Sequence, residues 1–146
     1  MNVRSAEPRD FDAVTALLEA LGRKEVTDET RDRCREIYAA QISDPAADHL
    51  VAVTDEGEVI GFCSVHFRKR LNFTTPEAWV PDLIVSEKVR RIGIGHALLE
   101  HAETRAIERG CWALSLESAH HRVEAHRFYG AFGMRDMGKA FRKLLG

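Results

Sequence analysis

The sequence predicts an α/β fold: one domain over residues 1–146, in which about four helices flank a central mixed sheet of six or seven strands. Three observations favour this fold. The length of 146 residues suits one domain, and no repeat, low-complexity tract or linker divides it. Apolar residues keep helical spacing up to residue 43 and then form β-branched runs between residues 50 and 65. Strand and helix patterns alternate after residue 78, which indicates a crossover connection.

Local signals set the boundaries of these elements. A helix begins after Asp10, which can act as its N-cap, and stops at Gly22. A second helix ends before Asp44-Pro45, because the residue that precedes a proline avoids the helical region. The predicted elements are, in order, a strand around Val3, helices 11–21 and 28–43, strands 50–53, 59–65 and 78–85, helix 94–109, strand 112–117, helix 123–132, and one or two last strands within 134–145.

Composition limits the classes of function. The formal net charge is -2 and the pI is near 6.4, so bulk charge does not favour binding to nucleic acid or to an anionic membrane. No signal peptide or membrane-spanning run of about 20 apolar residues is visible, and we expect a cytoplasmic protein. The three cysteines are widely spaced in apolar surroundings, which indicates reduced thiols rather than a disulfide framework or a zinc site.

The segment between the predicted strand 78–85 and the predicted helix 94–109 has the features of a phosphate site. It reads Arg90-Arg91-Ile92-Gly93-Ile94-Gly95, so glycine permits close backbone approach and arginine supplies charge at a helix N-terminus. The alternative is that the glycines only permit a tight connection. A phosphate loop of an NTPase is excluded because His96-Ala97 stand where lysine and serine or threonine are needed. A dinucleotide fold would need a third glycine at Leu98.

The chain resembles the GNAT superfamily of N-acetyltransferases. Three motifs carry the resemblance: residues 82–85 with Asp82-Leu83-Ile84-Val85, the loop of residues 90–95, and Ala125-His126-Arg127-Phe128-Tyr129 ahead of Gly133-Met134. Residues 71–76, Cys111-Trp112 and residues 121–129 are similar to the small aminoglycoside 6′-N-acetyltransferase-like branch. The order of elements fits that superfamily over nearly the whole chain.

The resemblance implies that the protein transfers an acetyl group from acetyl-CoA to a primary amine, by direct attack in a ternary complex. It implies that the backbone of Leu83, Ile84 and Val85 pairs with the pantetheine arm of the cosubstrate. It also implies that the loop of Arg90, Arg91, Ile92, Gly93, Ile94 and Gly95 holds the pyrophosphate. Phe128 would contact the cofactor, and Tyr129 would lie near the sulfur as the general acid. No metal is expected.

Three positions depart from the superfamily pattern. Arg91 replaces a glycine, Arg122 stands where an asparagine is common, and Pro81 occupies the place of an acidic residue that would deprotonate the amine. Proline is confined to edges or bulges of sheets, so a bulge at Pro81 would splay the central strands and free the N–H of Leu83 or Val85 for an oxyanion.

The candidate acids each have a structural alternative. Asp82 is a candidate catalytic residue and Glu77 a second one, but either can equally be a surface carboxylate. Spacing alone would place Tyr129 at the edge of a buried stripe as an aromatic core residue. The histidines at 120, 121 and 126 lack matching acids or cysteines for a metal.

Two functions of other classes remain open. One is a non-catalytic module that binds or senses acyl-CoA. The other is a nucleic-acid-binding domain that uses Arg68-Lys69-Arg70 with Phe67 and Phe73. The leading interpretation is an acetyl-CoA-dependent N-acetyltransferase with a small-molecule or peptide amine as substrate. A homodimer is possible through exposed apolar residues such as Phe73, Trp79, Phe141, Leu144 and Leu145.

Overall fold

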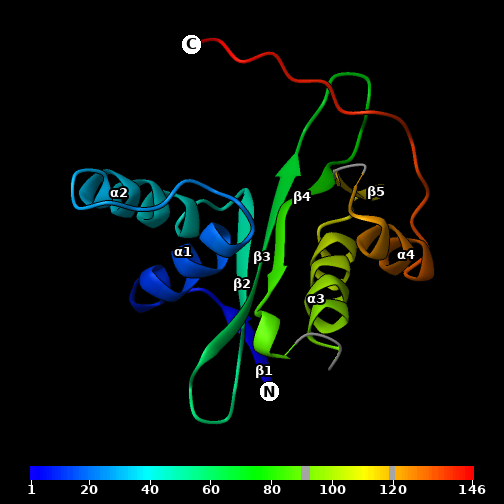
Figure 1. Ribbon diagram of the computed structural model, residues 1–146. Helices are drawn as coiled ribbons and strands as arrows, with labels where there is room; N and C mark the ends of the chain where they lie inside the picture. The colour runs from blue at the N-terminus through cyan, green and yellow to red at the C-terminus, as the bar shows by residue number, and fades with distance from the viewer. Residues whose placement is uncertain (90–92, 119–120) are drawn as a thin grey trace. The chain divides into compact units, whose positions relative to one another are not determined.

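Five strands form one sheet in the order β1-β2-β3-β4-β5. The computed structural model describes residues 1–89, 93–118 and 121–146 (Figure 1). The chain divides into two compact units, residues 1–115 and residues 116–146. The elements are β1 Asn2–Ser5, α1 Phe11–Ala20, α2 Arg31–Ile42, β2 Ala47–Val53, β3 Val59–Arg68, β4 Glu77–Val85, α3 Ile94–Glu108, β5 Ala113–Leu116 and α4 Val123–Ala131, with single 3-10 turns at Pro8–Asp10 and Glu87–Val89.

The first four strands are antiparallel neighbours. The connection from β4 to β5 runs through α3, which makes the sheet mixed, as predicted. The sixth or seventh strand expected within residues 134–145 is absent, because residues 134–146 contain neither helix nor strand. A strand needs a neighbouring strand, and the described residues of the second unit offer only the end of β5 and α4. Among the described residues, no helix is long and apolar enough to cross a membrane.

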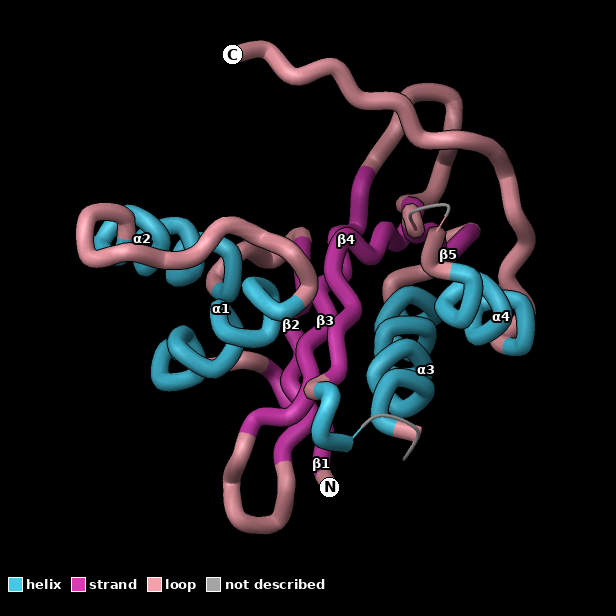
Figure 2. Tube along the Cα trace, in the orientation of Figure 1, coloured by secondary structure: helices cyan, strands magenta, loops and turns pink. Residues whose placement is uncertain are grey.

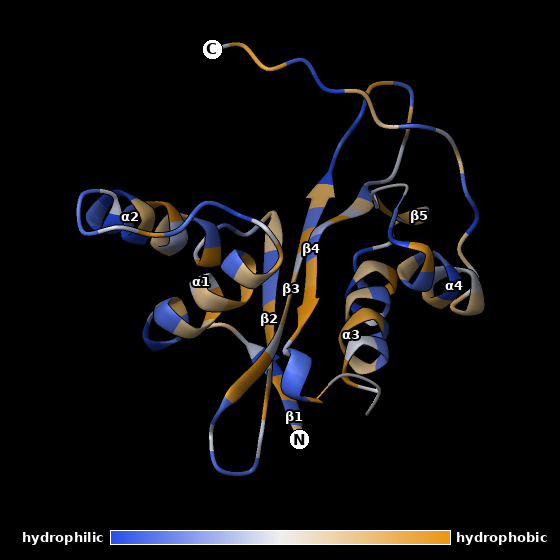
Figure 3. Ribbon diagram, in the orientation of Figure 1, coloured by the Kyte–Doolittle hydropathy of each residue, from blue (hydrophilic) through white to orange (hydrophobic). Residues whose placement is uncertain are grey.

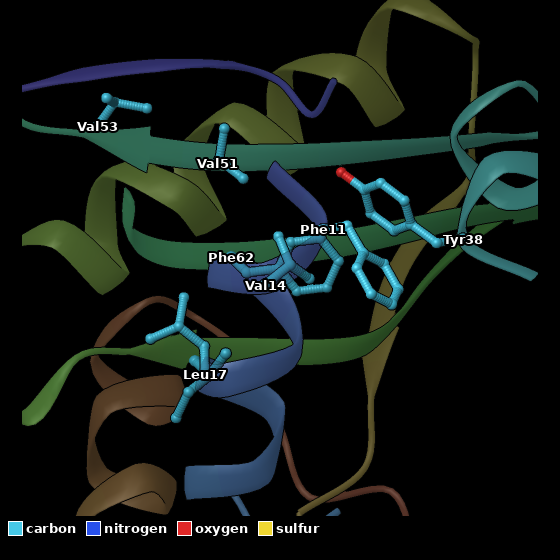
Figure 4. Close-up of a cluster of buried hydrophobic side chains, with 8 residues drawn as sticks. Phe11, Val14, Leu17, Tyr38, Val51, Val53 and Phe62 are labelled. Atoms are coloured by element: carbon cyan, nitrogen blue, oxygen red, sulfur yellow. The ribbon is translucent and has the colours of Figure 1, made fainter. Parts of the chain in front are cut away.

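Helices cover both faces of the sheet in the first unit. α1 and α2 lie on one face and α3 lies on the other (Figures 1 and 2). The α1 face holds a core in which Phe11, Val14 and Leu17 of α1 pack over the strands (Figure 4). Tyr38 of α2 joins this core, and its hydroxyl donates a hydrogen bond of 2.6 Å to the carbonyl of Glu7. Apolar residues therefore concentrate on the strands and on the helix sides that face them (Figure 3).

The α3 face depends on close packing at Gly61 of β3. Leu98 and Leu99 of α3 are fully buried there. A Cβ atom at Gly61 would lie 2.9 Å from Cδ1 of Leu98 and 3.3 Å from Cγ2 of Ile94, so only glycine lets the helix approach this strand. The contact fixes the N-terminal turn of α3 beside the paired residues Gly61 and Val85, at the end of β4.

A register shift between β3 and β4 marks a β-bulge at Pro81. Ser64 pairs with Asp82 and His66 pairs with Trp79, so two steps along β3 correspond to three steps along β4. The extra residue lies next to Pro81, where the missing N–H interrupts the ladder. The bulge expected from the proline is therefore present.

Substituting Gly61 tests the packing of α3. Gly61→Val should lower the free energy of unfolding by about 1–3 kcal/mol, because overpacking a filled core forces its neighbours to move. Urea unfolding followed by circular dichroism measures this loss. Gly130→Ala is the matched control, since no atom lies within 4 Å of its added Cβ. Equal stability of Gly61→Val and the wild type would contradict the packing at this strand.

Candidate active site

The last residues of β4 have one strand neighbour. Leu83, Ile84 and Val85 pair with Cys63, Phe62 and Gly61 of β3, respectively. On the other side, β5 starts opposite Pro76, whose carbonyl accepts the N–H of Trp112 at 3.0 Å. A strand advances about 3.3 Å per residue, so the four residues of β5 reach only the bulge. Among the described residues, the end of β4 has no strand partner on that side. This edge offers backbone groups to an extended ligand.

The N-terminus of α3 lies near this strand end. Gly93 is the N-cap in the left-handed conformation, with φ of 79°, and it has no side chain to occupy the first N–H groups of the helix. No acidic residue stands in the first turn. Ile94 is buried and Gly95 is half-buried. The first N–H groups of a helix have no intrahelical acceptor, and with the positive end of the helix dipole they suit a phosphate group. Arg90, Arg91 and Ile92 of the predicted loop lie outside the described residues.

A hollow of about 770 Å³ borders the same strand end. Its walls come from α1, from the hairpin between β2 and β3, and from residues 85–88. Its lining includes three cationic residues, Arg4, Arg9 and Lys88, and three acidic residues, Asp10, Glu58 and Glu87. The hollow thus extends the space beside the end of β4 onto the α1 face.

A row of three polar residues crosses the sheet on the face that α1 covers. His49 of β2, Ser64 of β3 and Asp82 of β4 stand opposite one another in the strand register. The preceding row on the same face is apolar, with Val51, Phe62 and Ile84. His49 and Ser64 are two of the four buried polar or charged residues found among the described residues. Burying polar groups costs free energy, so this row indicates a function.

Asp82 is held by two partners. The hydroxyl of Ser64 donates a hydrogen bond of 2.9 Å to Oδ2, and the guanidinium of Arg23, from the segment after α1, pairs with Oδ1. The side chain of Asp82 is only 12% exposed. Both carboxylate oxygens are therefore engaged, and Asp82 ties the segment after α1 to the sheet.

The next row brings aromatic rings together. His66 is opposite Trp79, with ring centroids 5.8 Å apart, and the ring of His49 lies 5.8 Å from His66. Nδ1 of His49 and Nε1 of Trp79 are buried and find no hydrogen-bond partner among the described residues. Burial lowers the pKa of His49, and the neighbouring His66 lowers it further. His49 is therefore neutral at pH 7.

Glu77, the other predicted acid, is also engaged. Arg68 donates to Oε1 at 2.6 Å and Ser115 donates to Oε2 at 3.1 Å. Arg70 lies 3.8 Å from the same carboxylate, and the guanidinium of Arg68 also stacks on Trp79 at 4.9 Å. Glu77 is thus a buried ion-pair partner rather than a free surface carboxylate.

Phe128 and Tyr129 belong to the second unit. Both lie on α4 and are half-buried, and their rings meet edge to face with centroids 5.5 Å apart. Gly133 ends the helix in the left-handed conformation, and the N–H of Met134 donates to the carbonyl of Tyr129 at 3.0 Å. The predicted site residues thus divide between the two units: 82–85 and 93–95 in the first, 128 and 129 in the second.

No metal cluster is found among the described residues, since no three His, Cys, Asp or Glu side chains are grouped as metal ligands. His121 and His126 are exposed, and His120 lies outside the described residues.

Comparison with known proteins identifies the architecture. The model of the acetyltransferase (GNAT) family matches residues 11–134. The aminoalkylphosphonate N-acetyltransferase of Salmonella typhimurium is 31% identical over 143 residues, which cover 98% of this chain and 90% of that protein. A putative acetyltransferase from Agrobacterium tumefaciens superposes with a TM-score of 0.87 at 22% identity, over 99% of this chain and 100% of that one. The aminoglycoside antibiotic 6′-N-acetyltransferase from Acinetobacter baumannii superposes with a TM-score of 0.79 at 21% identity, over 99% of each chain.

Sequence reasoning missed most of the polar face. His49, Ser64 and His66 lie within stretches predicted as strands or next to them. Ser64 and His66 have a buried apolar residue on both sides, and His49 has one at Leu50. The available signal was a polar residue at every second position of a strand, which shows that one sheet face is partly polar. No sequence pattern predicts the ion pair between Arg23 and Asp82, because only the fold brings these two residues together.

The low pKa of His49 makes stability depend on pH. Below its ordinary pKa of about 6.5, the unfolded chain binds a proton at this residue that the folded protein does not bind. The free energy of unfolding should therefore fall as the pH drops from 7 to 5. His49→Phe keeps a ring beside Phe62 and removes this proton, so the drop in melting temperature between pH 7 and pH 5 should be smaller than in the wild type. An unchanged drop would show that His49 titrates normally.

Proposed function

We propose that this chain, which belongs to the acetyltransferase (GNAT) family and is an acetyl-CoA-dependent acyltransferase, acetylates the primary amine of a small acceptor that also carries an anionic group. The acceptor class is suggested by the aminoalkylphosphonate N-acetyltransferase at 31% identity. The likeness to the aminoglycoside enzyme is a likeness of fold alone and gives no substrate. The family match extends across the boundary at residue 115, which supports one functional domain.

The residues at the end of β4 fit the cosubstrate. The edge of Leu83, Ile84 and Val85 would bind the pantetheine arm through backbone hydrogen bonds. The N–H groups at Gly95 and Ile94, with Arg90 and Arg91, would hold the pyrophosphate. The thioester of bound acetyl-CoA supplies an activated acetyl group.

The observation that carries the acceptor assignment is the polar face beyond α1. Trp79 has an indole N–H with no acceptor among the described residues, and indole nitrogen only donates. Arg68 stacks on its ring, and Arg70 lies 3.8 Å from Glu77, the carboxylate to which Arg68 donates. Guanidinium groups bind phosphonate or carboxylate oxygens well, so this end of the face suits the anionic group of the acceptor.

The acceptor amine would attack the thioester directly in a ternary complex. An N–H of Leu83 or Val85, next to the bulge, would stabilise the oxyanion. Tyr129 would give its proton to the departing thiolate. Asp82 would act through its negative charge by attracting the ammonium group, because its two oxygens already accept bonds from Ser64 and Arg23.

Direct assay tests the function. The protein with acetyl-CoA should release free thiol with aminoalkylphosphonates of two and three carbons, and mass spectrometry should find the N-acetylated product. Alkylamines of the same length without an anionic group are the matched controls and should give a much higher KM. Turnover of the plain amines alone would contradict the anionic acceptor, and CoA binding without turnover of any amine would favour the sensing module.

Removing one hydroxyl tests the role of Tyr129. Tyr129→Phe keeps the ring that packs against Phe128 and removes the proton donor. A phenol with a pKa of about 10 is protonated at neutral pH, so its loss should lower kcat by about 10- to 1000-fold with little change in acetyl-CoA affinity. Steady-state kinetics and calorimetry measure both. Full kcat in the variant, with chemistry shown to limit the rate, would mean that water or the substrate protonates the thiolate.

A further inference from the structure

We propose that His66 is the general base that takes a proton from the ammonium group of the acceptor. This inference rests on the proposed function and names a residue at the acceptor end of the same site. Primary amines resemble lysine, whose pKa is about 10.4, so most of the acceptor arrives protonated at pH 7 and cannot attack. A base that works near neutral pH must remove this proton, and imidazole is the side chain best suited to the task.

The acids on this face are poor candidates for the base. Ser64 and Arg23 occupy the two oxygens of Asp82, and Arg68 and Ser115 occupy those of Glu77. A carboxylate oxygen that already accepts a hydrogen bond or an ion pair is not free to take a proton from the acceptor. Pro81, where relatives of this superfamily often carry an acid, has no side chain that could act.

His66 is the available base on the same face. It is half-buried on β3, two residues from Ser64, and therefore shares the face of Asp82 and Trp79. Its ring nitrogens make no hydrogen bond to any described residue. The ring is held at 5.8 Å from His49 on one side and at 5.8 Å from Trp79 on the other. His66 is thus oriented by packing, with nitrogens left for a ligand.

The charged groups around His66 are paired with one another. His49, the titratable group of β2 in ring contact with it, stays neutral because burial lowers its pKa. The charged groups on this face are Asp82 and Glu77 of β4, Arg68 of β3, Arg70 of the segment after β3 and Arg23 of the segment after α1. Arg23 pairs with Asp82, and Arg68 and Arg70 lie beside Glu77, so each guanidinium group has a carboxylate next to it.

The proton step is simple. An N–H bond of the ammonium breaks, its electron pair stays on the amine nitrogen, and the proton moves to an unprotonated nitrogen of His66. The imidazolium then loses this proton to water, which restores the base. No oxidant, reductant or further reactant is involved.

The pH dependence of catalysis tests the assignment. For the wild type, kcat/KM should rise with pH between about 5 and 8, the range in which an imidazole base becomes neutral, and then level off. His66→Gln keeps a polar side chain and should lower kcat/KM at pH 7 by about 100-fold, the usual size of a general-base contribution. The remaining activity should increase steadily up to the pKa of the amine itself. His101→Gln, on the exposed side of α3, is the matched control and should keep the wild-type profile.

A rescue experiment separates chemistry from structure. His66→Ala should recover activity on addition of imidazole, in proportion to its neutral form, while a purely structural loss would not respond. A wild-type pH profile in His66→Gln, or no rescue of a folded His66→Ala variant, would overturn the proposal. A wild type that turns over no amine at all would instead overturn the proposed function, so the two failures are distinct.

Discussion

The bulge at Pro81 is the constraint on which the candidate site depends. Asp82 and Trp79 are three positions apart, and the period of a strand is two, so a regular strand would place them on opposite faces. The extra residue at the bulge returns both to the α1 face, opposite Ser64 and His66. A proline suits this position because it has no N–H for the ladder. This bulge thus brings together the polar face on which we propose that the acceptor binds.

The two faces of the sheet contribute different parts of the candidate site. The α3 face brings the helix N-terminus against Gly61, beside the strand end where the cosubstrate would bind. The α1 face is apolar beneath Phe11, Val14 and Leu17, and it becomes polar at the row that starts with His49. An unpaired polar atom inside a protein is costly. Nδ1 of His49 and Nε1 of Trp79, which have no hydrogen-bond partner in the described part of the chain, therefore lie where stability alone would place apolar groups. Binding of a ligand to these two nitrogens would explain why polar groups stand there.

The relatives and the site supply different kinds of information. Structures at 21–22% identity share the fold, which many substrates can use. Side chains on the acceptor face decide which amine is bound, and here they combine two engaged carboxylates, two imidazoles, an indole donor and several guanidinium groups. That set favours an acceptor with an amine at one end and an anion at the other.

The sequence by itself determined the order of the elements, because periodicity and turn residues act locally. The helix from Ile94 was predicted to within one residue at its end, and the bulge followed from Pro81, whose ring cannot donate to a ladder. The assignment of the loop of residues 90–95 to a pyrophosphate stays a prediction, because Arg90, Arg91 and Ile92 lie outside the described residues. Only the tertiary structure decided that the sheet has five strands, because pairing of residues 134–145 depends on partners distant in the chain. The engagement of Asp82 by Arg23, and the meeting of His49 with His66 and Trp79, were likewise decided by strand register, which joins residues that no local pattern connects.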